Sequence, residues 1–360
     1  MNGQNTVFED DFYDPTSSIE EAEATAEEDL WFLPGPAEEE PAFLSPVQCA
    51  EPSETEAVRN SVREWAEVER EHAARLARVA GRLGALDDRL ARGPTGWRHR
   101  LALIEAADLS WFAGNRVGPD RLALWLSMRL SGVQADQAAL MRVGWAFRRL
   151  SGGPGPRADL PAFLDRRDPE GIAPDAERFE DRSSNWLAMI HAGADLHPIT
   201  CACMGYHLWA MSGLGETGGG QIDAAVTAAR IATGEARGMV FTPLAMGGAG
   251  GMRAAGTPSE RLGRWLDGMT NATLAATRHL DEVEIWEHRA IDQMARLSGR
   301  TPAALRRVLT EWPLISAPMV EALTAASRAA VQRNLLWMQD RGLIHEVTGQ
   351  GRYRMWRIAR

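Results

Sequence analysis

The sequence predicts a mainly α-helical protein with one β-hairpin close to the C-terminus. Three observations support this prediction. Apolar residues recur at steps of three and four along most of the chain after residue 57, which is the period of an amphipathic helix. Glycine or proline interrupts these runs where helices are expected to end. After Gly342 the pattern changes to alternation, which is typical of strands.

Composition, charge and spacing divide the chain into five segments. With 360 residues, of which 45% are hydrophobic and 24% are charged, the chain is long enough for two or three packed units. The segments are a disordered acidic arm, an N-terminal helical region, a linker rich in Pro, Arg and Asp, a helical core and a C-terminal module. In that order, their bounds are 1–56, 57–150, 151–183, 184–298 and 300–360.

The acidic arm differs from the rest of the chain in charge. Residues 1–57 contain 16 acidic and no basic side chains, whereas the net charge of the whole chain is −10, so the remainder carries about +6. Low hydrophobicity and several prolines cannot support a core, and we therefore expect this arm to be disordered. Apolar clusters around Phe12 and Trp31 interrupt it. They are able to dock on a partner or on the chain itself, although a solvated tail is the simpler interpretation.

The N-terminal helical region begins with a long amphipathic helix whose apolar residues run from Val62 to Leu90. Its nearly heptad spacing permits a coiled-coil homodimer, but Gly81 and Gly84 weaken such a helix and we favour packing within the monomer. The linker 151–183 has five prolines and no period, which predicts a loop. Further helices are expected at 97–113, 118–131, 135–150, 184–195, 197–212, 221–233 and 257–298.

The C-terminal module has the pattern of a helix-turn-helix. A short helix begins at Thr301, followed by proline in its first turn. Ser316 and Ser327 then cap two more helices, which about three residues separate. Two alternating runs, LIHEV and RYRMWRI, follow with the turn TGQG between them, which predicts a hairpin. Three helices and a hairpin in this order indicate a winged helix, in which the last helix enters the DNA major groove and the wing contacts phosphate or the minor groove.

The charge of the module agrees with DNA binding, because residues 300–360 hold ten arginines and four acids. Apolar residues of the last helix at i, i+4 and i+7 must face the core, which turns its polar residues outward. Arginine there suits guanine and glutamine suits adenine, while wing arginines suit phosphate. The predicted DNA-binding residues are Ser327, Arg328, Gln332, Arg333, Arg352 and Arg354. A winged helix that binds only proteins is the alternative.

A resemblance to an uncharacterised alphaproteobacterial family, often plasmid-borne, is found in PLISAPMVEAL…AAVQRNLLWMQDRGLIHEVTGQGRYRMWRI. In that family a helix-turn-helix domain follows a helical domain of unknown function. The similarity extends more weakly over GALDDRLARGPTGWRHRLALIEAADLSWFAGNRV and over SNWLAMIHAGADLHPITCACMGYHLWAMSG. Together these stretches cover most of residues 83–360, without the acidic arm. The resemblance implies a DNA-binding module on a helical body.

The helical domain of this family is distantly similar to the Fic fold, whose active members carry HPFxxGNGR between two helices. The corresponding place here holds MSGLGETGGGQIDAAV, in which Gly219 stands near the asparagine position and Gln221 near the arginine position. The catalytic histidine is absent, so there is no proton acceptor, and no arginine clamps the phosphates. The resemblance therefore implies no adenylyl transfer. A vestigial anion loop at Gly218, Gly219, Gly220 and Gln221 is the alternative to a plain loop.

A metal site is suggested by HxxxCxCxxxH, which comprises His197, Cys201, Cys203 and His207. On one helix, however, the two His–Cys pairs lie about 200° apart, so one tetrahedral metal cannot bind all four. We expect buried thiols and no metal. All 39 basic residues are arginines, which excludes Schiff-base chemistry and a phosphate-loop lysine. No catalytic triad or dinucleotide motif is present, and we expect neither a catalytic residue nor a cofactor.

The sparse cysteines and the lack of about 20 consecutive apolar residues predict a cytoplasmic protein without a membrane partner. We expect a regulator of transcription or plasmid maintenance whose partner is duplex DNA. The alternatives are a protein-interaction scaffold, or a degenerate Fic-like protein that retains nucleotide binding. The acidic arm is expected to bind the chain's own basic module and so to compete with DNA for its arginines.

Overall fold

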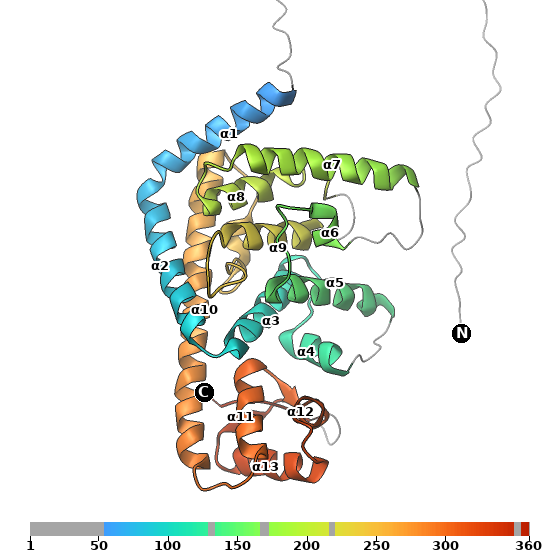
Figure 1. Cartoon of the computed structure of the whole chain (residues 1–360), viewed down its shortest axis with the longest axis vertical. Helices are drawn as coiled ribbons and strands as arrows, with labels where there is room; N and C mark the ends of the chain where they lie inside the picture. Colours follow the sequence, from blue (N-terminus) through green and yellow to red (C-terminus); the bar gives the residue numbers. More distant parts are fainter. Residues whose placement is uncertain (1–53, 129–133, 166–172, 216–219, 349–353, 360) are drawn as a thin grey trace, which may run out of the picture. The chain divides into compact units, whose positions relative to one another are not determined.

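The computed structural model describes residues 54–128, 134–165, 173–215, 220–348 and 354–359 (Figure 1). These residues are mainly α-helical, as the sequence predicts, with thirteen α-helices, one 3₁₀ helix and three short strands. Residues 52–360 form one compact unit. The acidic arm lies outside the described residues up to position 53, and the first helix begins at Glu54, inside the bound of 56 expected for the arm.

Short connections join many of the elements, whereas residues 233–257 form a long segment with one 3₁₀ helix. The α-helices are α1 (Glu54–Glu71), α2 (Ala73–Arg92), α3 (Thr95–Phe112), α4 (Pro119–Met128), α5 (Gln134–Ser151), α6 (Leu160–Leu164), α7 (Ala173–Ala192), α8 (Pro198–Leu208), α9 (Gly220–Ala232), α10 (Pro258–Met294), α11 (Thr301–Glu311), α12 (Ala317–Thr324) and α13 (Arg328–Asp340). The 3₁₀ helix is η1 (Ala249–Met252), and the strands are β1 (Ile315–Ser316), β2 (Ile344–Glu346) and β3 (Met355–Ile358).

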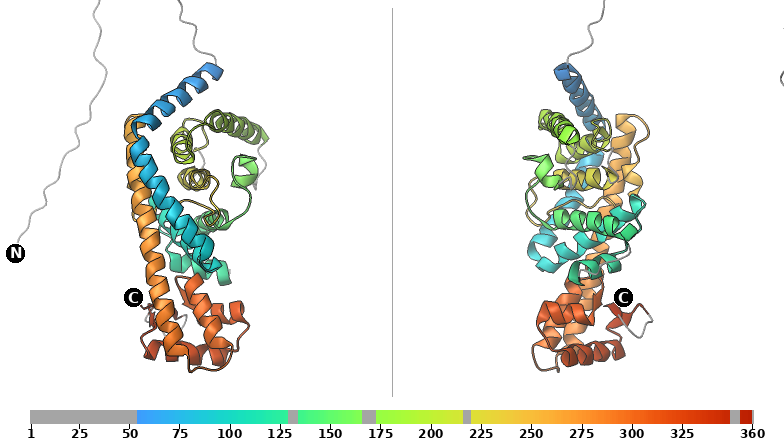
Figure 2. Two further views of the ribbon diagram at one scale, coloured as in Figure 1. Left: turned by 60° about the vertical axis from the view of Figure 1, so that its left-hand side comes forward. Right: turned by 90° about the vertical axis from the view of Figure 1, so that its right-hand side faces the viewer.

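α10 is 37 residues long and lies beside α2 (Figures 1 and 2). Its start is fixed by a reciprocal cap, in which the Thr257 side chain accepts from the Glu260 N–H and the Glu260 carboxylate accepts from the Thr257 N–H. Ion pairs join the two helices farther along. The guanidinium of Arg89 in α2 lies 2.6 Å from the Asp281 carboxylate and 2.9 Å from the Glu284 carboxylate of α10.

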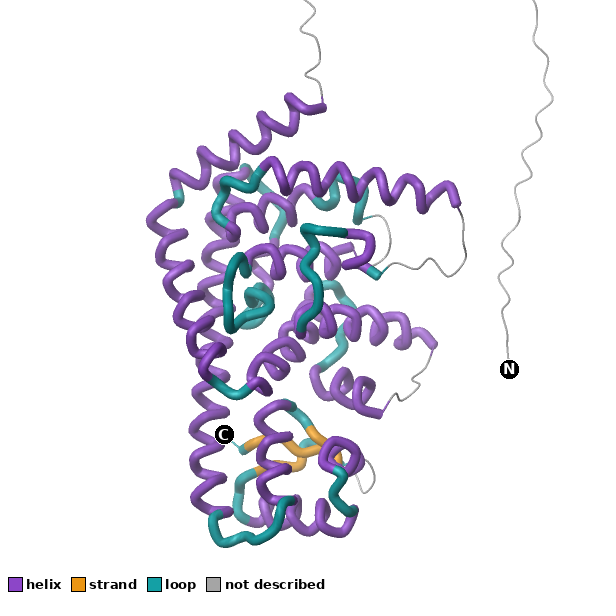
Figure 3. The backbone as a smooth tube through the Cα atoms, viewed as in Figure 1, coloured by secondary structure: helices purple, strands orange, loops and turns teal. Residues whose placement is uncertain are grey.

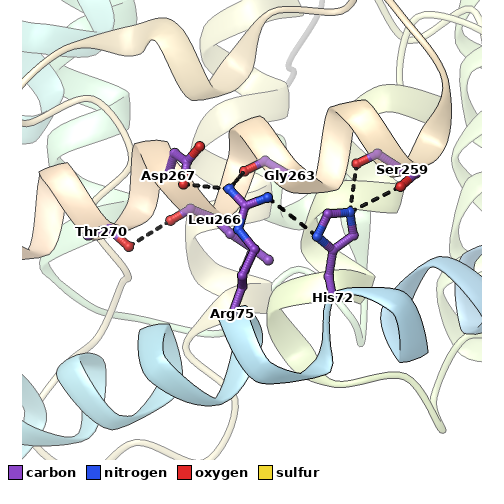
Figure 4. A network of polar contacts seen from close by, with 7 residues as sticks. All are labelled: His72, Arg75, Ser259, Gly263, Leu266, Asp267 and Thr270. Atoms are coloured by element: carbon purple, nitrogen blue, oxygen red, sulfur yellow. Dashed lines mark hydrogen bonds and ion pairs between the residues drawn. The ribbon is translucent and has the colours of Figure 1, made fainter.

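The prediction of a single long helix from Val62 to Leu90 is wrong. The chain turns at His72 and forms two helices, α1 and α2, instead. The His72 imidazole explains the turn (Figure 4). Its Nε2 lies 3.1 Å from both the carbonyl oxygen and the hydroxyl of Ser259. Arg75, one turn later, donates to the Gly263 carbonyl oxygen and pairs with Asp267. These contacts with α10 depend on tertiary packing, so the apolar period of α1 and α2 does not reveal them.

The prediction of a loop over residues 151–183 is also partly wrong, because α6 and the first half of α7 lie in this range. Asp159 caps α6 by accepting from the Ala162 N–H at 2.8 Å. Leu160 and Phe163 of α6 are buried in the core. Five helical residues are too few to show a helical period, so only the cap and its apolar neighbours signal this element.

One hydrophobic core extends from Trp65 in α1 to Ile358 in β3, so the helical regions and the C-terminal module share it. A carboxylate holds the long loop before α10 in place. The buried Glu105 of α3 accepts from the backbone N–H groups of Leu244, Ala245 and Met246 at 2.8, 2.9 and 3.0 Å. Among the described residues, no helix is both long and apolar enough to span a membrane.

The three strands form one antiparallel sheet in the order β1–β3–β2 (Figure 3). The pairing of β2 with β3 agrees with the expected hairpin, and Ile344 lies opposite Ile358. β1 was not expected, because two residues cannot show an alternating pattern. It precedes α12 and pairs with β3, with Ile315 opposite Trp356.

Candidate nucleic-acid interface

α12 and α13 are joined by a three-residue turn, and a serine side chain caps the start of each helix. Ser316 caps α12, since its hydroxyl accepts from the Met319 N–H at 3.3 Å. α12 ends at Thr324, and the next residue, Ala325, has a positive φ of 53°. Ser327 caps α13 by accepting from the Ala330 N–H at 3.4 Å. The predicted caps and the predicted spacing of the helix pair are therefore both present.

α13 has a buried and an exposed face, and the boundary lies where the sequence pattern places it. Three apolar side chains are completely buried: Val331, Leu335 and Met338. The predicted base-contacting residues Arg328, Gln332 and Arg333 are exposed, and Ser327 is exposed at the start of the helix. Within the described part of the chain, neither Arg328 nor Arg333 forms an ion pair. Two guanidinium groups and one carboxamide thus extend from one helix face into solvent.

Of the two arginines predicted to contact phosphate from the wing, only Arg354 lies in the described part of the chain. Arg352 lies outside the described residues. Arg354 is exposed as expected, but its Nε lies 3.6 Å from the carboxylate of Glu346 on the neighbouring strand. The side chain of Glu346 is largely buried, which makes this pair stronger than one between two fully exposed groups. The charge of Arg354 is therefore partly neutralised before any partner is bound.

Four further arginines of the module are exposed and were not predicted: Arg300, Arg307, Arg341 and Arg357. Arg357 of β3 lies opposite His345 of β2, on an exposed part of the sheet. Alternation along the strand puts Arg357 on the same face as the buried Met355, so the pattern gave no signal of its exposure. Arg341 follows α13, and its guanidinium lies 5.2 Å from the centroid of the Trp337 ring. A tryptophan four residues before an arginine on a helix was a signal for this contact.

Helices of the body hold the module from two sides. The Trp286 indole N–H of α10 donates to the Leu343 carbonyl oxygen at 2.7 Å, and Arg289 donates to the Ala359 carbonyl oxygen at 2.8 Å. From α3, the buried Arg100 donates to the carbonyl oxygens of Leu309 and Trp312 at 2.9 and 2.8 Å. The sequence gives no sign of these contacts, because more than 50 residues separate each pair.

The glycine loop before α9 does not resemble an anion site in its described part. Gly218 and Gly219 lie outside the described residues. Gly220 starts α9, where an added Cβ would collide with the Gly215 backbone, while Gln221 is exposed. The first turn of α9 also contains the buried Asp223, whose carboxylate lies 3.5 Å from the Arg142 guanidinium. A negative side chain thus already occupies the positive end of this helix.

The histidines and cysteines of HxxxCxCxxxH do not come together. His197 caps α8, and its Nδ1 accepts from the Ile199 N–H at 3.2 Å. Cys201 and Cys203 are both buried with free thiols. The His207 ring stacks on Trp65, with the centroids 6.5 Å apart. Among the described residues, no group of three or more histidine, cysteine or acidic side chains is arranged to hold a metal ion.

No protein-family model matches this chain, and no curated protein matches it. Its function is therefore inferred from its residues and their geometry.

Proposed function

We propose that the protein is a non-enzymatic, cytoplasmic DNA-binding regulator of transcription or plasmid maintenance, in which residues 300–360 act as a winged helix. The observation that supports this most strongly is the exposed face of α13, with Arg328, Gln332 and Arg333, directly after a three-residue turn. The element order and the sheet order β1–β3–β2 also support it, since a winged helix has a strand between its first two helices and a hairpin after the third.

The side chains of α13 have the chemistry that base recognition needs. A guanidinium donates two parallel hydrogen bonds to O6 and N7 of guanine, and a carboxamide both donates to and accepts from adenine. Arg328 lies in the first turn, close to the helix end that usually meets base edges, and Gln332 and Arg333 follow one turn later. Because neither arginine has an ion-pair partner within the described residues, no pair must break before DNA is bound.

The wing is expected to contribute less to the affinity for DNA than α13 does. The guanidinium of Arg354 must leave the Glu346 carboxylate, at 3.6 Å, before it binds a phosphate. Its contribution to affinity is therefore smaller than that of an unpaired arginine. Such a contact is with the backbone and carries no sequence information.

The first test is salt-dependent binding of the full chain to duplex DNA. The full chain is required because α3 and α10 hold α11 and the hairpin, so residues 300–360 alone lose these contacts. We expect the logarithm of the affinity to fall with the logarithm of the salt concentration at about −0.9 per phosphate contact, or roughly −3 to −5 for one module. Absent or salt-independent binding contradicts the proposal and favours a winged helix that binds proteins.

Single substitutions separate base contacts from phosphate contacts. Arg333→Ala is expected to cost about 1–3 kcal/mol at one base position of a selected target and much less on unrelated duplexes. Arg354→Ala is expected to weaken all sequences alike, and by less, because its charge is already shared with Glu346. If both variants lower affinity equally on all duplexes, α13 is not the element that reads the sequence.

In DNA binding, the helical body is expected to have a structural role only. We propose that it positions the module and that it does not transfer adenylyl groups, since the loop before α9 has neither a catalytic histidine nor a phosphate-binding arginine. Radiolabel transfer from ATP above a boiled control contradicts this part. Kinship with the plasmid-borne family and with the Fic fold stays a prediction from the sequence.

A further inference from the structure

A groove of about 250 Å³ lies between α2, the start of α8 and the segment that follows α9. Its walls are mainly small and apolar, and the larger side chains are those of Leu83, Ile199 and Met239. The residues of the C-terminal module do not line it. It is smaller than the pockets of drug-sized ligands, which span roughly 300–1,000 Å³, and it suits a fragment-sized molecule.

Gly84 lines the groove in a way that local packing does not explain. It lies in the interior of α2, where glycine costs about 1 kcal/mol of helix stability relative to alanine. A Cβ added at this position meets no atom within 4 Å, so nothing in the described structure requires the missing side chain. The effect of glycine here is to leave the groove open.

The groove has two acidic side chains, of which Asp87 is fixed in place by hydrogen bonds. The Asp87 carboxylate accepts from the N–H groups of Gly238 and Met239, both at 2.7 Å, and of Arg237 at 3.2 Å. Its two oxygens offer about four acceptor positions, so one position remains. The exposed Glu235 also lines the groove. α9 ends at Ala232 beside it, which adds the negative end of a helix dipole.

His197 adds one hydrogen-bond donor to this acidic wall. Its Nδ1 accepts from the Ile199 N–H, so the ring carries its proton on Nε2. Among the described residues, Nε2 has no hydrogen-bond partner. No arginine lines the groove, although the chain has 39 basic residues.

The geometry points to a binding site for a small organic cation, with its ammonium group beside Asp87 and Glu235 and its apolar body on Leu83, Ile199 and Met239. A hydrogen-bond acceptor on the ligand would lie at His197. The negative wall favours a cation over the neutral or anionic analogue of the same shape. This inference concerns the body alone and does not depend on DNA binding by the C-terminal module.

The chain offers a matched pair of substitutions for the test. Gly84→Leu places a side chain in the groove, whereas Gly81→Leu makes the same change three residues earlier, at an exposed position outside the groove where a Cβ also meets nothing within 4 Å. Both changes improve helix propensity, so both variants are expected to fold. Glu235→Gln removes one exposed charge and keeps the shape of the side chain.

The probe is 2-phenylethylammonium chloride, with 2-phenylethanol as its neutral analogue. We expect the cation, added to the full-length protein, to raise Tm by about 2 °C or more in the wild-type protein and in Gly81→Leu. We expect no rise in Gly84→Leu, and titration calorimetry should show about fivefold weaker binding to Glu235→Gln. The inference is overturned if the cation has no effect, if 2-phenylethanol acts equally, or if Gly84→Leu responds like Gly81→Leu.

Discussion

Glu105 has a fully buried carboxyl group whose surroundings act on its charge in opposite directions. Burial raises the pKa of Glu105 to about 7, although the backbone N–H groups of Ala245, Leu244 and Met246 favour the carboxylate and lower it. The native state therefore binds this proton more tightly than the unfolded state, in which the pKa is about 4.5. Stability is expected to fall as the pH rises from about 4.5 to about 7.

Replacing Glu105 by glutamine should remove this pH dependence. Glu105→Gln is expected to lower the free energy of unfolding by about 1–3 kcal/mol at pH 5, because the carboxamide NH₂ cannot accept from a backbone N–H. The loss should be smaller at pH 8, where the wild-type protein holds a buried charge. Urea unfolding at the two pH values measures this. The same urea unfolding of Asp108→Asn at the two pH values serves as a comparison, because burial also raises the pKa of Asp108, to about 6. An unchanged difference between pH 5 and pH 8 contradicts the account.

Arg100 shows how one side chain joins the body to the module. It is 2% exposed, and besides its bonds to Leu309 and Trp312 its Nε lies 2.7 Å from His279 Nε2. Arg100→Met leaves these buried acceptors unpaired, and we expect a loss of about 3 kcal/mol in the free energy of unfolding. Arg92→Met, at an exposed position of α2, is the matched control and should change stability by less than about 0.5 kcal/mol. Equal losses in the two variants mean that Arg100 is not a structural link.

The turn between α12 and α13 contains a local conflict between residue type and backbone. Ala325 has φ 53° and ψ 24°, a left-handed conformation that costs an L-residue about 1 kcal/mol and glycine little. Ala325→Gly is therefore expected to stabilise the protein by about 0.5–1 kcal/mol. Ala322→Gly, in the exposed interior of α12, should destabilise it by about 1 kcal/mol. Urea midpoints that move in the same direction for both variants contradict the assigned turn.

Elements with a long apolar period were predictable, whereas very short elements and turns that depend on tertiary contacts were not. The apolar spacing of α13 was sufficient to place Arg328 and Arg333 on an exposed face. β1 has two residues and α6 has five, so neither shows a period. The turn at His72 depends on Ser259, which is 187 residues away.

In the candidate site, too, local features were predictable from the sequence and features that depend on tertiary contacts were not. The caps at Ser316 and Ser327 and the exposed face of α13 follow from local patterns, which a single sequence contains. The pairing of Arg354 with Glu346 depends on the register between β2 and β3, which the sequence pattern does not fix. The groove at Gly84 depends on how α2 packs against α8 and α9, and helix periodicity does not reveal that packing.

Opposite charges are concentrated at the two ends of the chain. The 16 acidic residues before residue 58 are tethered to a module with about +6, so the two are expected to attract each other at a high effective concentration. Removing residues 1–53 should tighten DNA binding about threefold or more at low salt, and the gain should shrink as salt screens the charges. Binding curves of the full and shortened chains at two salt concentrations measure this. Superimposable curves at low salt mean that the N-terminal segment does not compete with DNA.

The most direct test of DNA recognition by α13 compares two double variants of the full chain that lose the same charge. Arg328→Ala with Arg333→Ala changes the exposed face of α13, and Arg78→Ala with Arg82→Ala changes an exposed face of α2. Each is titrated against a duplex selected from a random pool by the wild-type protein. We expect a loss of about 2 kcal/mol or more for the α13 variant and wild-type affinity within a factor of about two for the α2 variant. Equal affinities of the two variants for the duplex would contradict DNA recognition by α13.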